Sequence, residues 1–223
     1  MKAMTHPDYT RAATAAAETL IKHNITTAPV IPLPILKSMP GTLVLSFTEV
    51  ADRIGLDRQN VISTFNVENR DVITAYIPGD GKLKYVVAYN QRLPFYMLQR
   101  SLARELAHIV LGHDGTRPES VRNEESLCFA RHLLCPRPLI KALQDAGVLI
   151  TIETIGNVTG CYERCLIGLR KTPGVDVPAS INRLVREQFA DYVTNYVDCQ
   201  PIIPPDEDST PVDFGTYMDN YTE

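Results

Sequence analysis

The sequence of 223 residues lacks several features that would assign it to a specialised class of protein. No run of apolar residues approaches the ~20 that a membrane-spanning helix requires. The N-terminal segment 1–20 is interrupted by charged residues and lacks the apolar core of a secretion signal. The five cysteines are an odd number without a CxxC pair, which is typical of reduced thiols. We therefore expect a cytoplasmic protein without a membrane segment.

The sequence also lacks the excess of basic residues that is typical of nucleic-acid-binding proteins. It has 22 Lys and Arg residues against 26 Asp and Glu residues, and six of the acids lie in segment 201–223, which has no basic residue. The rest of the chain is therefore close to neutral. The same segment contains four prolines, so we expect an acidic, disordered C-terminal tail.

Periodicity and turn residues indicate strands in the first half of the chain. An alanine-rich helix is predicted over Tyr9–His23. The proline-rich segment 26–40 should be extended or hold at most one short turn of helix. Strands are predicted at 43–47, 72–77 and 83–89. The last two flank Pro78-Gly79-Asp80-Gly81, which is a strong signal for a hairpin.

The second half of the chain has the pattern of helices. Helices are predicted at 94–111, 118–134, 137–146, 148–170 and 178–197. Proline or glycine lies at most of their ends. The fold class is therefore α+β, with a small antiparallel sheet packed on a helical bundle. We expect an N-terminal helix and linker (1–40), an α+β core (41–147), a C-terminal helical part (148–200) and the acidic tail (201–223).

Segment 104–108, RELAH, differs in its first residue from the His-Glu-x-x-His motif of zinc peptidases. In that motif two histidines bind zinc from one face of a helix, and the glutamate deprotonates the zinc-bound water. Glu105 and His108 match the general base and the second ligand. Arg104 stands at the first ligand position, and a guanidinium has no lone pair to offer a metal.

With the following helix included, the sequence resembles the ImmA/IrrE family of zincin-like metallopeptidases. The residues that carry the resemblance are RELAHIVLGH at 104–113 and NEESLCFARHLLCP at 123–136. The resemblance covers roughly residues 8–170 and implies a zincin-like fold. It also implies a glutamate as the third zinc ligand, at the position that Asn123 occupies in this chain.

The family's role, as the resemblance implies it, is cleavage of a helix-turn-helix repressor on a mobile element or in a stress response. Zinc would be the cofactor, with Glu105 as the general base and His108 as a ligand. A rearranged site could consist of His108, Glu124 and either His113 or Cys128. His113 could reach such a site because Gly112 interrupts the helix.

A site without metal is the second interpretation. Arg104 would lie where the metal would be and pair with Glu124 or Glu125, its guanidinium replacing the dication as counter-charge. The chain would then be a catalytically inactive pseudo-peptidase that binds a protein partner and needs no cofactor.

A DNA-binding regulator is the third interpretation. Segment 48–65 has small and apolar residues at the spacing of a helix-turn-helix motif, and 58–65 would be its recognition helix. The near-neutral charge of the chain body argues against direct nucleic-acid binding.

Overall fold

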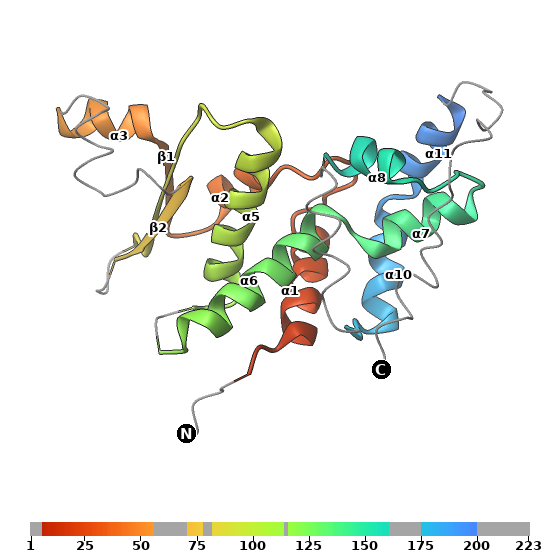
Figure 1. Ribbon diagram of the computed structural model, residues 1–223, viewed down its shortest axis with the longest axis horizontal. Coiled ribbons are helices and arrows are strands. Elements are labelled where there is room, and N and C mark those ends of the chain that lie inside the picture. Colours follow the sequence, from red (N-terminus) through yellow and green to blue (C-terminus); the bar gives the residue numbers. More distant parts are fainter. Residues whose placement is uncertain (1–5, 56–70, 78–81, 114–115, 161–174, 200–223) are drawn as a thin grey trace.

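The computed structural model describes residues 6–55, 71–77, 82–113, 116–160 and 175–199, and these residues form an α+β fold. Figure 1 shows a small sheet at one end of the molecule and helices over the rest. Among the helices of these ranges, none is long and apolar enough to cross a membrane. The acidic segment 201–223, predicted to be disordered, lies outside the described residues.

Within the described residues, the sheet contains three strands in the order β1-β3-β2, namely β1 (Thr42–Ser46), β2 (Val72–Tyr76) and β3 (Tyr85–Tyr89). β2 and β3 are antiparallel, as the hairpin signal predicts. β1 is parallel to β3, so the sheet is mixed and the prediction of an antiparallel sheet is wrong for this strand. Parallel neighbours need a long connection, which here includes a helix and β2 itself. This order leaves β2 at an edge of the sheet.

Helix α3 (Phe47–Ile54) follows β1 without a loop because a capping box starts it. The Glu49 N–H donates to Ser46 Oγ, and the Glu49 carboxylate accepts from the Ser46 N–H. Gly55, with a φ of 66°, ends the helix in the left-handed conformation. α3 is the first part of the possible helix-turn-helix motif. The predicted recognition helix, 58–65, lies outside the described residues.

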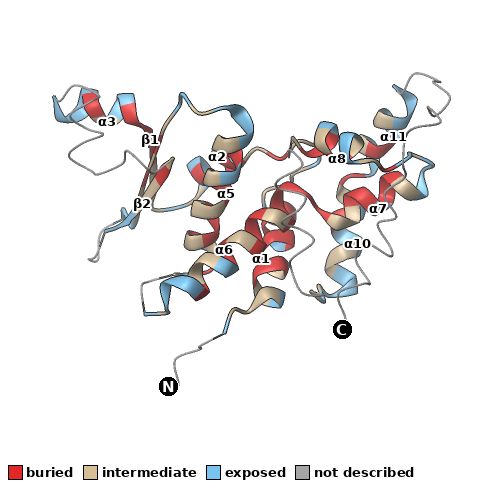
Figure 2. Ribbon diagram, in the orientation of Figure 1, coloured by how far each residue is buried: buried red, intermediate tan, exposed pale blue. Residues whose placement is uncertain are grey.

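Three helices form the centre of the molecule: α1 (Tyr9–Lys22), α5 (Phe95–Val110) and α6 (Glu119–Leu134). Their bounds agree with the predicted helices to within one or two residues. Ala12, Ala13 and Ala16 of α1 are fully buried, and such small side chains let two helices approach closely. Figure 2 shows buried residues gathered where α1 and α6 meet.

The proline-rich segment contains a helix, α2 (Pro32–Ser38), which is longer than the single turn expected. Pro32 and Pro34 lie in its first turn, where backbone N–H groups have no helical partner, so they do not oppose the helix. The helices after α6 that the structure describes are α7 (Arg137–Asp145), α8 (Ile152–Thr159), α10 (Ala179–Gln188) and α11 (Ala190–Asp198). The predicted helix 178–197 is interrupted at Phe189, whose side chain is fully buried.

In the part of the chain that the structure describes, α8 (Ile152–Thr159) is the observed counterpart of the predicted helix 148–170, and it is shorter than that prediction. α8 begins after Thr151, whose side chain accepts a hydrogen bond from the Thr154 N–H. It ends at Gly160, which has a φ of 65°. The remainder, 161–170, lies outside the described residues.

Candidate functional site

The end of α5 returns His113 to the face of the helix that bears His108. Gly112 has a φ of 63°, its N–H donates to the Ile109 carbonyl, and the His113 N–H donates to the His108 carbonyl. These two hydrogen bonds form a Schellman motif. The two imidazoles therefore meet, with 2.8 Å between their Nδ1 atoms. A regular helix would place residues five positions apart on different faces.

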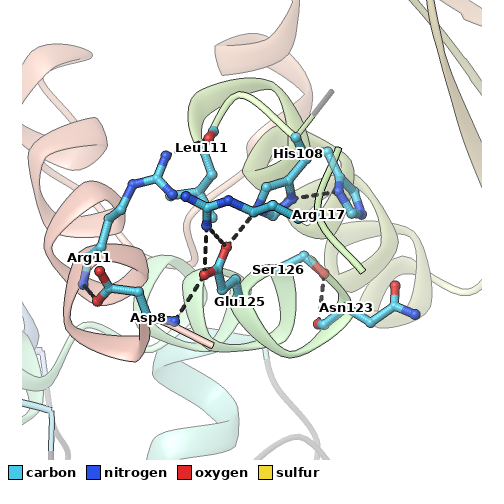
Figure 3. A network of polar contacts seen from close by, with 9 residues as sticks. Asp8, Arg11, His108, Leu111, Arg117, Asn123, Glu125 and Ser126 are labelled. Atoms are coloured by element: carbon cyan, nitrogen blue, oxygen red, sulfur yellow. Dashed lines mark hydrogen bonds and ion pairs between the residues drawn. The ribbon is translucent and has the colours of Figure 1, made fainter. Parts of the chain in front are cut away.

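The carboxylate of Glu125, on α6, is the centre of the polar contacts around these histidines (Figure 3). Its side chain is 1% exposed. It accepts from Nε2 of His113 at 2.9 Å, from Nη1 of Arg117 at 2.9 and 3.0 Å, and from the backbone N–H of Asp8 at 2.9 Å. A buried carboxylate is strongly destabilising unless it is paired and hydrogen-bonded. These three donors therefore make its burial possible.

Helix α1 is attached to the same region by a second contact. Arg11 Nη2 donates to the carbonyl oxygen of Leu111, the residue that caps α5, at 2.5 Å (Figure 3). A cation at a helix C-terminus complements both the unpaired carbonyls and the helix dipole. The start of α1 thus contacts α6 through Asp8 and α5 through Arg11.

The contacts with Glu125 determine which ring nitrogens carry hydrogen. A carboxylate only accepts hydrogen bonds, so the hydrogen of neutral His113 is on Nε2. Its Nδ1 then accepts from Nδ1–H of His108, which leaves the lone pair of His108 on Nε2. Burial, His113 and Arg104 lower the pKa of His108 to about 4. Burial also lowers the pKa of His113, although Glu125 opposes the change.

His108 lines a cleft of about 470 Å³ between β2 and the helices α5 and α6. The cleft is also lined by Arg104, Glu105 and Asn123. The structure therefore brings together all four positions at which the ImmA/IrrE resemblance places the metal ligands and the general base. His113 lines the cleft as well.

The two residues that replace expected zinc ligands contact each other. Nη2 of Arg104 donates to Oδ1 of Asn123 at 3.4 Å, which is long for a hydrogen bond. Nε of Arg104 is buried and has no hydrogen-bond partner among the described residues. The predicted ion pair of Arg104 with Glu125 is wrong, because Arg117 and His113 bind that carboxylate instead.

Two other predicted site residues face α1 and do not line the cleft. Glu124 is exposed, and its Oε2 accepts from the Tyr9 hydroxyl at 3.4 Å. Cys128 is buried with its Sγ 3.5 Å from the Tyr9 carbonyl oxygen, and burial raises its pKa to about 12. The structure therefore does not bring Glu124 or Cys128 to His108, and Arg104 does not pair with Glu124.

The residues present do not fit a tetrahedral zinc site. Such a site takes at least three His, Cys, Asp or Glu ligands. Nε2 of His108 is suitably placed, but both nitrogens of His113 are engaged, and a guanidinium occupies the first ligand position. Within the described ranges, no three side chains of these types are grouped closely enough to hold a metal ion.

Several residues of the cleft were not identified from the sequence. Ser101 Oγ donates to Asp71 Oδ2 at 3.2 Å, and both residues line the cleft. Arg122 also lines it, with a buried Nε that has no partner among the described residues. Arg122 could have been identified as a cleft residue from the sequence, because it immediately precedes Asn123 on α6. Asp71 is distant in sequence from the helices, so only the sheet brings it to the cleft.

A scan against protein-family models and a search of curated proteins found no match to this chain. The resemblance to the ImmA/IrrE family therefore remains a proposal that rests on residues 104–136 and on their arrangement.

The Glu125 carboxylate should contribute strongly to stability. Glu125→Gln removes the charge that pairs with Arg117 and replaces one acceptor oxygen by an amide donor, so we expect the free energy of unfolding to fall by about 3 kcal/mol. Glu124→Gln, at the exposed neighbouring position, should change it by less than about 0.5 kcal/mol. Urea unfolding followed by circular dichroism measures both variants. Equal stabilities of the two variants would contradict the role given to Glu125.

Acid should weaken the fold through His108. Its pKa in the folded chain is about 4, below the ordinary 6.5. Between these values the unfolded chain binds more protons than the folded chain, so the free energy of unfolding falls as the pH is lowered. Urea unfolding at about pH 7 and about pH 5 should show a smaller loss for His108→Gln than for the unaltered chain. An equal loss would mean that the pKa of His108 is not lowered.

Proposed function

We propose that this protein is a pseudo-peptidase that binds an extended segment of a partner protein in the cleft between β2 and α5. The observation that supports this most is the contact between Arg104 and Asn123. These two residues stand at the positions where a zinc peptidase of this type would have ligands. The cleft that they line is open.

The edge of β2 supports peptide binding. β2 pairs with β3 on one side, and the described residues include no strand on its other side. The hydrogen bonds from Asn90 N–H to the Asp71 carbonyl and from Ile77 N–H to the Lys84 carbonyl fix the alternation along β2. The N–H and C=O groups of the even-numbered residues, such as Thr74, therefore point to the open edge. Edges of this kind recruit extended peptides as an added strand.

Asp71, Glu105 and Glu119 line the cleft beside two arginines, and it is the two arginines that indicate which peptides fit. Arg104 and Arg122 each have a buried Nε without a partner among the described residues, and both line the cleft. A guanidinium binds a carboxylate with two parallel hydrogen bonds. We therefore propose that the bound segment carries an acidic side chain that reaches these arginines while its backbone pairs with β2.

An active zinc peptidase is the second candidate. It is favoured by Glu105 and His108 lying in one cleft, and by the contacts from Glu125 through His113 that orient His108 with its Nε2 lone pair free. Metal-binding histidines are commonly held in this way through their second nitrogen. The partner that the resemblance implies, a helix-turn-helix repressor, would be a substrate in this case and a binding partner in the first.

Blocking the edge of β2 should weaken peptide binding. Linear peptides selected from a random displayed library should bind Thr74→Pro at least tenfold more weakly, because proline removes the outward N–H. Proline is tolerated at an edge position of this kind. Thr74→Ala keeps the N–H and should bind as the unaltered protein does. Fluorescence anisotropy measures the affinity of each variant for the peptides. Peptides that bind Thr74→Pro as tightly as the unaltered protein would contradict strand addition.

Zinc retention separates the two candidates. After exposure to zinc and dialysis, the unaltered protein should retain well under one zinc ion per chain, because a cation and an amide replace two ligands. The double variant Arg104→His with Asn123→Glu should approach one ion per chain. Arg100→His, at an exposed position of α5, is the control for an added surface histidine. Elemental analysis measures the zinc content of each protein. Stoichiometric, chelator-resistant zinc in the unaltered protein would favour the peptidase.

A further inference from the structure

A second cavity of about 490 Å³ is lined by residues of α1, α7 and α10. In Figure 1, α7 and α10 lie at the other end of the molecule from β2, which lines the cleft. One part of its wall is apolar and includes Ala13 and Ala17 of α1 and Val185 of α10. Another part is basic and contains four cationic side chains, those of Arg137, Lys141, Arg183 and Arg186. Asp176 is the one acidic residue among the described lining residues.

Three of the four cations have carboxylate partners. Asp145 pairs with Lys141 at 3.0 Å and with Arg186 at 2.7 Å. Arg183 pairs with Glu187 at 3.7 Å. Arg137 forms no ion pair with any described residue, and its Nε is buried without a hydrogen-bond partner among them. Arg137 therefore brings an unmatched positive charge to the wall of the cavity.

His132, near the C-terminal end of α6, lies beside this charge. The residue is 6% exposed, lines the cavity, and has a buried Nε2 without a partner among the described residues. Burial and the charges of Arg137 and Arg131 lower its pKa to about 3, so the ring is neutral near pH 7. Buried polar atoms are nearly always hydrogen-bonded. Two unmatched nitrogens on one cavity wall therefore point to an acceptor that binds between them.

We infer that this cavity binds a small organic oxyanion, a carboxylate or a phosphate that is attached to an apolar body. The oxyanion accepts hydrogen bonds from Arg137 and from Nε2–H of His132, and the apolar body packs on Ala13, Ala17 and Val185. The volume is in the range of small-molecule sites, which are mostly apolar with a few placed polar groups. A guanidinium is the preferred partner of both oxyanions.

The cavity is independent of the cleft proposed for peptide binding. Asn123, near the start of α6, lines the cleft, and His132, near its end, lines the cavity. A ligand in the cavity therefore does not require that the cleft bind peptide or metal.

Titration of the full chain with four probes tests the inference. Octanoate and octyl phosphate carry the two head groups, octanol lacks the charge, and inorganic phosphate lacks the apolar body. Isothermal titration calorimetry should show that octanoate or octyl phosphate binds at least tenfold more tightly than octanol and inorganic phosphate. The tighter of the two identifies the head group. Failure of both, or equal binding of octanol or inorganic phosphate, would overturn the inference.

Arg137→Met should weaken binding of the tighter probe at least tenfold, and Arg100→Met, on exposed α5 surface, should leave it within twofold. Unweakened binding by Arg137→Met would also overturn the inference.

Because Arg137→Met could fail to fold, the unaltered protein provides a second measurement. The ¹⁵N resonances of the His132 ring should shift on titration with the tighter probe, and unchanged resonances at saturation would exclude contact with His132.

Discussion

The buried carboxylate of Glu125 is the interaction on which the arrangement of the central helices depends. It is 1% exposed, and its donors come from three separate parts of the chain: the residue that caps the start of α1, the turn that follows α5, and the segment before α6. An unpaired carboxylate at this depth would be strongly destabilising. Each donor must therefore be in place, and this requirement fixes α1 and the end of α5 against α6.

The same requirement sets the chemistry of the cleft. His113 satisfies Glu125 with Nε2, so its other nitrogen orients His108, and the lone pair of His108 is left on Nε2. Beside this neutral histidine, Arg104 contacts Asn123 instead of a metal. The cleft thus combines a histidine held as in a metal site with a cation at the position where the ImmA/IrrE resemblance would place the first ligand. The proposed binding of an acidic peptide would use that cation, whereas binding of zinc would have to displace it.

Most of the helical elements and the β2–β3 hairpin could be predicted from the sequence, because periodicity and turn residues are local signals. The convergence of Arg104, Glu105, His108 and Asn123 was also an expectation, which the resemblance to the ImmA/IrrE family implied. The parallel pairing of β1 was not, since strand order depends on contacts between distant segments. Glu124 and Glu125 show a second limit: they differ by about 100° around α6, and only packing decides which is buried.

X-ray diffraction from zinc-soaked crystals, recorded above and below the zinc absorption edge, tests the central claim most directly. The account predicts no anomalous density in the cleft among Arg104, His108 and Asn123, and it predicts that the guanidinium of Arg104 stays against Asn123. An anomalous peak about 2.1 Å from Nε2 of His108, with Arg104 moved aside, would contradict it. In that case the cleft would be a metal site, and the peptidase would become the leading interpretation.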